Sequence, residues 1–173
     1  MNKFIQTIGF ASLLLLIAGC GTKAIVVKNQ MPSSVITSQQ ANLPTKNAKI
    51  SLFVLHNYTD TPEAGMRVTN IIEGMLISKG YHVVEHFDAT HLSLQKAAQI
   101  AQQDGSDYFF RGGVSEWRYK TGIDGEPAVS FQCTLYDAKT LAVVWSATGA
   151  DSRWGNDSIG TTAQNLLEQM LKP

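Results

Sequence analysis

Two carboxylates lie close together in the second half of the chain, in a segment that predicts a β-hairpin. Residues 116–120 alternate between charged and aromatic side chains, which predicts a strand with one polar face. Residues 121–127 hold two glycines, which tolerate the positive φ angles of a chain reversal, and end on a proline that can start a return strand. Asp124 and Glu126 are therefore expected at the tip of the hairpin.

A pair of carboxylates can serve as a general acid and base, or it can attract cations. Acid catalysis needs a carboxyl group with a raised pKa, which requires burial or a second negative charge within a cleft. An exposed hairpin tip gives Asp124 and Glu126 no such surroundings, so attraction of cations is the favoured chemistry. Lys120 offsets part of the charge. Two unit charges about 10 Å apart in water interact by only ~0.4 kcal/mol, so one hairpin would hold a charged polymer weakly.

The remaining residues offer little for catalysis. His82 and His86 lie four residues apart and could form a metal site with Asp88 or His91, although exposed histidines are the simpler interpretation. The sequence shows no Ser/His/Asp or Cys/His signature of a nucleophilic enzyme, and the glycines at 112–113 lack the spacing of a phosphate-binding loop. We expect neither an enzyme nor a bound cofactor or metal.

A tryptophan lies in the connection between the last predicted strand and the last predicted helix. Residues 151–155 read Asp-Ser-Arg-Trp-Gly, which places Trp154 beside Arg153. One interpretation folds the ring of Trp154 back onto the core. The other places these two residues at a bilayer surface or a subunit contact, where an apolar ring with one N–H donor is well suited.

The N-terminus predicts a lipoprotein signal peptide over residues 1–19. Lys3 precedes an apolar run at 10–17, which is shorter than the roughly 20 residues of a membrane-spanning helix. The run continues into Leu-Ile-Ala-Gly-Cys, which resembles the lipobox of bacterial lipoproteins and makes Cys20 the expected lipidation site. Acyl chains would then hold the protein on a bilayer. Gly21, in place of an aspartate after the cysteine, favours the outer membrane.

The composition of the mature chain excludes some classes of function. Removing residues 1–19 leaves 154 residues, enough for one domain, with 13 Lys+Arg against 14 Asp+Glu. This balance gives no basic excess, so nucleic acid is not an expected partner. Cys133 is the one cysteine besides Cys20, so no disulfide within the chain is expected, and its place on an apolar strand predicts burial.

Residues 20–47 predict a tether and residues 48–173 a single α/β domain. The tether is rich in Ser, Thr, Gln, Asn and Lys, apart from a short apolar run at 25–27 that could add an edge strand. Its length gives a root-mean-square reach of about 30 Å. The folded domain could therefore stand away from the membrane.

Within the domain, the hydrophobic periodicity predicts five strands and three helices in the order βαβαβββα. The strands are expected near residues 49–56, 81–85, 107–120, 128–137 and 141–149. Asp60 or Thr61 is predicted to cap the first helix, Ser93 the second, and a residue at 156–158 the third. Ser115, Trp117 and Tyr119 are expected to share one face of the third strand. The result is an α/β sandwich of two or three layers with a mixed five-stranded sheet.

Four segments resemble signature segments of the PelC family, the lipoproteins of the Pel exopolysaccharide export machinery. They read Asn-Tyr-Thr-Asp-Thr-Pro-Glu-Ala-Gly at 57–65, Glu-Trp-Arg-Tyr-Lys at 116–120, Ile-Asp-Gly-Glu-Pro-Ala-Val at 123–129 and Val-Trp-Ser at 144–146. The resemblance runs from about residue 50 to the C-terminus and includes the lipobox. The Asp-Gly-Glu-Pro hairpin is its most specific part.

The resemblance implies a ring of about a dozen copies on the periplasmic side of the outer membrane, beneath the β-barrel exporter PelB. Its acidic mouth would collect a partly deacetylated, cationic polysaccharide for biofilm formation. Asp124 and Glu126 would supply the acidic ring, and Trp154 with Arg153 would face the membrane or the barrel. Such a ring would gather roughly 12 to 24 negative charges around one opening, which concentrates cations there.

A second interpretation is a lipoprotein that activates a periplasmic cell-wall synthase, since such activators can share a lipidated tether and a similar domain. It predicts a monomer that binds an enzyme domain, whereas the export interpretation predicts a large closed oligomer. A periplasmic hydrolase or metal protein is a third class, which stoichiometric bound metal would reveal.

Overall fold

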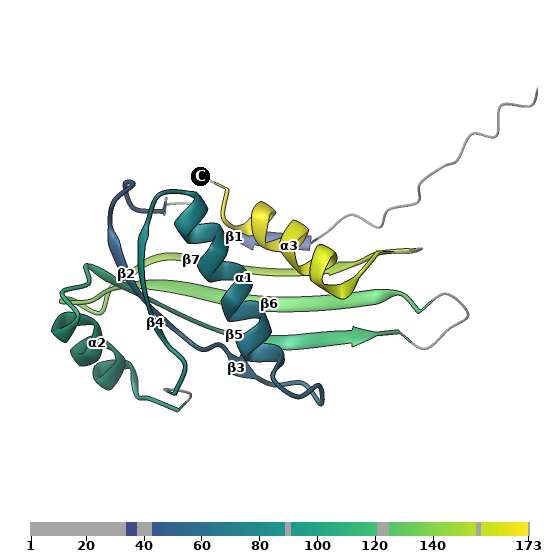
Figure 1. The fold of residues 1–173 in the computed structure, drawn as a ribbon, viewed down its shortest axis with the longest axis horizontal. Helices are drawn as coiled ribbons and strands as arrows, with labels where there is room; N and C mark the ends of the chain where they lie inside the picture. The colour runs from purple at the N-terminus through teal and green to yellow at the C-terminus, as the bar shows by residue number, and fades with distance from the viewer. Residues whose placement is uncertain (1–33, 38–42, 89–90, 121–124, 155–156, 173) are drawn as a thin grey trace, which may run out of the picture.

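A computed structural model describes residues 34–37, 43–88, 91–120, 125–154 and 157–172 (Figure 1). In chain order its elements are β1 (Ser34–Thr37), β2 (Lys49–Phe53), β3 (His56–Asn57), α1 (Ala64–Ser78), β4 (His82–His86), α2 (Leu94–Gln103), β5 (Tyr108–Tyr119), β6 (Pro127–Asp137), β7 (Val143–Ser152) and α3 (Ile159–Met170). From β2 onward, and leaving out β3, this is the predicted order βαβαβββα. The α/β class is therefore confirmed.

The elements form one mixed sheet with strand order β1-β7-β6-β5-β2-β4. β2 is parallel to both β4 and β5, and the strands from β5 through β6 and β7 to β1 are antiparallel. The chain moves from β2 to β4 in one direction and from β4 to β5 in the other. Because crossover connections are almost always right-handed, α1 and α2 are expected on opposite faces of the sheet.

The sheet has seven strands, so the prediction of five was wrong. The strand predicted at 49–56 is interrupted after Phe53, and His56–Asn57 pairs separately with β5 as β3. The other added strand, β1, comes from the segment predicted to be a tether. It pairs with β7, and Val35 packs against the core while Ile36 is exposed. A strand of four residues with one apolar side chain inward leaves little periodic signal in the sequence.

The hydrophobic core lies on both faces of the sheet, but unequally. The larger core packs α1 and α3 on one face and includes Val68, Phe131 and Leu166. The smaller core packs α2 against Phe53 and Phe109 on the other face. Figure 1 shows α2 at one end of the molecule and the β5–β6 hairpin extending at the other. The sandwich therefore has three layers near α2 and two layers toward the hairpin.

Beyond α2, the second face of β5, β6 and β7 is not covered by a described helix, and we call it the open sheet face. Buried and more exposed residues alternate along β6 and β7, as expected for strands with one covered face. Gln132 and Thr148 are exposed there, whereas Cys133 is buried in the core as predicted. Burial raises the pKa of the Cys133 thiol to about 12.

A β-bulge in β5 changes which side chains reach the open sheet face. The register with β6 shifts between Val114 and Glu116, so no residue of β6 is paired in register with Ser115. Trp117 is buried, as predicted, but Ser115 is exposed and its Oγ lies 2.9 Å from Ser130 Oγ. The prediction that Ser115 shares a face with Trp117 was therefore wrong.

Candidate functional site

The predicted hairpin is present, and β5 and β6 are its two long strands. Tyr119, the last residue of β5, accepts at its hydroxyl oxygen from Ile159 N at the start of α3 over 3.1 Å. β5 and β6 pair from Tyr108 opposite Asp137 to Tyr119 opposite Pro127. Past the last pair, Lys120 N donates to Glu126 O over 2.6 Å, and Gly125 has a φ of 52°, which a glycine adopts without strain. In Figure 1 this end of the hairpin extends past α1 and α3.

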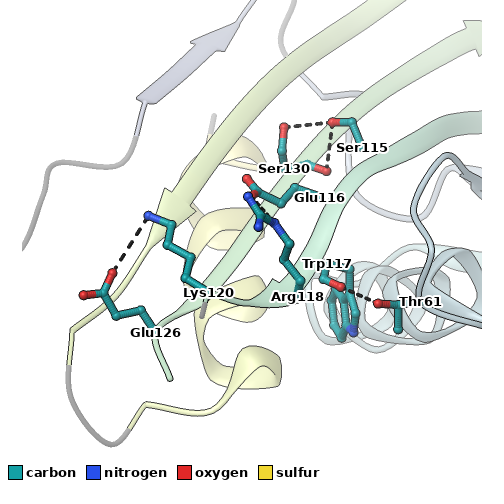
Figure 2. A network of polar contacts seen from close by, with 8 residues as sticks. All are labelled: Thr61, Ser115, Glu116, Trp117, Arg118, Lys120, Glu126 and Ser130. Carbon is teal, nitrogen blue, oxygen red and sulfur yellow. Dashed lines mark hydrogen bonds and ion pairs between the residues drawn. The ribbon is translucent and has the colours of Figure 1, made fainter. Parts of the chain in front are cut away.

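The structure describes only one of the two predicted acidic residues at the hairpin tip. Asp124 lies outside the described residues. Glu126 lies at the start of the return strand with its side chain 21% exposed, and its Oε2 is 3.9 Å from Lys120 Nζ (Figure 2). An ion pair this long and this accessible is weak, but it turns part of the Glu126 charge toward its own chain. Of the two acidic residues, Glu126 is the one that the described part of the chain places beside a neighbouring charge.

Trp154 is exposed and lies at the same end of the sheet as the hairpin tip. Its side chain is 61% exposed, so the interpretation in which the ring folds back onto the core was wrong. Arg153 N donates to Pro127 O over 3.1 Å, which ties the loop to the first residue of β6. Residues that are remote in sequence, 126–127 and 153–154, are thus brought together.

Arg153 points inward rather than away from the protein. Its Nε donates to Asp151 Oδ2 over 2.8 Å, and the two side chains are 13% and 0% exposed. Asp151 gave no functional signal in the sequence, yet it holds the base of the loop that carries Trp154. Of the two residues predicted to contact a membrane or partner, Trp154 is the one that presents most of its side chain to solvent.

The tether enters the sheet at this end. β1 is antiparallel to β7, with Ser34 opposite Ala150 and Thr37 opposite Ala147. β1 therefore begins on the side where β7 leads into Trp154. Cys20 lies outside the described residues and precedes Ser34 by 14 residues in the sequence.

The open sheet face also carries a hollow that sequence reasoning missed. It has a volume of about 390 Å³ and lies between the Tyr58–Thr61 loop and the outer part of β5. Glu116 accepts from Arg118 Nε over 2.9 Å at its edge, and Thr61 Oγ1 donates to Trp117 O over 2.7 Å (Figure 2). The loop and β5 are more than 50 residues apart in sequence, so only the fold brings them together.

The histidines take part in separate contacts in different parts of the described chain. His86 Nε2 lies 2.7 Å from Asp104 Oδ2, and the rings of His56 and His91 are 5.4 Å apart. Burial, then the charges of Arg111 and His91, lower the pKa of His56. Within the part of the chain that the structure describes, no three His, Cys, Asp or Glu side chains are grouped to hold a metal ion. None of the described helices combines the length and apolarity needed to cross a membrane.

Comparison with solved structures finds the same fold in two PelC dodecamers and in a lipoprotein. A PelC dodecamer from Paraburkholderia phytofirmans is 32% identical, with a TM-score of 0.72 over 81% of this chain and 95% of that one. A single-substitution variant of that dodecamer matches at 32% identity and a TM-score of 0.70, over 80% and 96% of the two chains. A lipoprotein from Neisseria meningitidis shares the fold at 18% identity and a TM-score of 0.56, over 70% and 96%. No protein-family model and no curated protein sequence matches the chain.

The fold and its exposed end define an α/β domain of the kind found in bacterial lipoproteins. The chain belongs to the PelC family.

Proposed function

We propose that the protein is a non-enzymatic subunit of a Pel polysaccharide export complex. Copies of the chain form a ring on the periplasmic face of the outer membrane, and the acidic opening of the ring guides a cationic exopolysaccharide to the PelB barrel. The observation that supports this most is the shared location of the hairpin tip, Trp154 and the start of β1 at one end of the sheet.

We orient the proposed ring by this shared location. A lipid on Cys20 would hold the start of β1 near the bilayer, and the exposed ring of Trp154 would contact the lipid headgroups or the barrel. The hairpin tip with Asp124 then lies close to the point where the polymer enters the barrel.

Repetition makes the weak charge of one hairpin useful. Asp124 and Glu126 against Lys120 leave one net negative charge per tip. The relative from Paraburkholderia phytofirmans is a dodecamer, and a ring of twelve would place about twelve such charges around one axis. Each contact stays screened beyond about 8–10 Å, so a polymer is drawn in without being held.

Export in cells tests this proposal. We expect Asp124→Asn to lower export of the polymer and Asp124→Lys to lower it further, while the mass of the assembled protein is unchanged. Asp88→Asn is the matched control, because Asp88 is an exposed acidic residue that follows β4 at the far edge of the sheet. Normal export in both Asp124 variants would refute the role of the acidic opening. A monomer at every concentration would refute the ring and favour the activator of a cell-wall synthase.

A further inference from the structure

The hollow beside β5 has the features of a small binding site. It is lined by the loop that holds Tyr58 and Asp60 and by residues of two strands, among them Ser115, Glu116 and Arg118 of β5 and Ser130 of β6. Its volume of about 390 Å³ lies within the range of small-molecule pockets. We call it the Tyr58 pocket.

Tyr58 is an exposed aromatic ring held in a fixed place. Its side chain is 68% exposed, but its backbone N–H donates to Val114 O over 2.9 Å. The ring packs on Gly113, where a Cβ atom would come within 2.6 Å of Tyr58 Cε2. Gly113 leaves room for the Tyr58 ring, since a Cβ atom there would displace it. The ring lies over the glycine as a flat platform, and its outer part stays in solvent.

The polar groups around the platform can still form hydrogen bonds or ion pairs with a ligand. Asp60 is exposed and makes no hydrogen bond or ion pair with the described residues, while Asn57 and Thr61 of the same loop are bonded internally. Glu116 is paired with Arg118, so Asp60 leaves the pocket with one net negative charge. The paired hydroxyls of Ser115 and Ser130, 2.9 Å apart, can each exchange that contact for a ligand oxygen.

We propose that the Tyr58 pocket binds one amino-sugar unit of the transported polymer, an inference that rests on the proposed function. The sugar ring would lie on Tyr58, its ammonium group would face Asp60 and the aromatic ring, and its hydroxyls would meet Ser115 and Ser130. Glu116 and Lys120 belong to one strand face, about 13 Å apart at the usual rise of a strand. A single polymer chain can therefore contact the pocket and the hairpin tip together.

Calorimetric titration of the full lipidated protein in detergent tests the pocket, with a glucosamine pentamer as the probe and its fully N-acetylated form for comparison. We expect the glucosamine pentamer to bind more tightly. Tyr58→Ala and Asp60→Asn should each weaken its binding about two- to fivefold, the range of an exposed cation–π contact, and Tyr58→Phe should retain it. Phe87→Ala is the control, because Phe87 is an exposed aromatic residue after β4.

Unchanged binding in Tyr58→Ala would overturn the pocket, and so would a loss of assembly mass in that variant, since Tyr58 would then be a subunit contact. If only the pocket proposal is wrong, Asp124→Asn and Asp124→Lys still lower export of the polymer. Failure of the proposed function would show the reverse, with pentamer binding that depends on Tyr58 but export that is indifferent to Asp124.

Discussion

Replacing Arg153 with methionine should strongly destabilise the fold. The carboxylate of Asp151 is fully buried, its Oδ2 accepts from Arg153 over 2.8 Å, and its Oδ1 has no hydrogen-bond partner in the described part of the chain. In Arg153→Met the carboxylate stays buried but loses the cation that compensates it. Removing one partner of such a pair typically costs about 3–5 kcal/mol of the free energy of unfolding.

A second arginine provides a matched control. Arg118 Nε donates to Glu116 Oε1 over 2.9 Å across the same two-residue spacing, but these side chains are 62% and 29% exposed. Because exposed pairs contribute little, Arg118→Met should change the free energy of unfolding by no more than about 1 kcal/mol. The double variant Asp151→Asn/Arg153→Met removes both charges and should recover part of the loss.

Equilibrium unfolding in urea, followed by tryptophan fluorescence, measures these differences. All variants must be compared at one protein concentration, because self-association raises the apparent stability as concentration rises. Similar losses of unfolding free energy in Arg153→Met and Arg118→Met would refute the inference that burial makes the Asp151–Arg153 pair the more important one for stability.

Three further predictions concern single side chains. Trp154→Ala should leave the urea midpoint nearly unchanged, because the ring is 61% exposed, but should weaken binding of the non-lipidated chain to vesicles in a sedimentation assay; undiminished binding would count against a membrane contact. Cys133, with its pKa raised to about 12 by burial, should react with a thiol reagent at pH 8 only after unfolding, and rapid labelling of the folded protein would contradict its burial. The pKa of His56 is lowered by burial and by Arg111 and His91, so the unfolded chain takes up a proton first and stability should fall as pH drops below about 6.5. His56→Gln should flatten that pH dependence, and an unchanged slope would argue against it.

Much of the framework could be predicted because it rests on local periodicity. The long strands β5, β6 and β7 alternate with period two, and the glycines before Pro127 mark the reversal, so the hairpin was placed correctly. Ser93 caps α2 by accepting from Lys96 N, and Ser158 caps α3 by accepting from Thr161 N, as predicted.

The errors lie where tertiary contacts overrule local signals. α1 begins after Glu63, which has a φ of 60° and makes no side-chain cap, so the predicted cap at Asp60 or Thr61 was wrong. Thr61 instead donates its hydroxyl to Trp117 O in the neighbouring strand, a partner that the local sequence does not show. The bulge at Ser115 and the pairing of β1 likewise depend on strands that are distant in sequence.

The candidate site was predictable in its residues but not in its arrangement. Trp154 could be identified as unusual, but its exposure and the inward turn of Arg153 toward Asp151 are seen only in the folded chain. Its position beside the hairpin follows from the pairing of β6 with β7, which sequence alone did not align. The Tyr58 pocket combines a loop and a strand that become neighbours only in the folded sheet.

A structure of the lipidated protein in a bilayer, determined by electron cryo-microscopy, tests the central claim most directly. We expect a closed ring in which the 121–126 tips surround one opening and Trp154 lies against the lipid. Isolated copies in the bilayer, or tips that face outward from the ring axis, would contradict it.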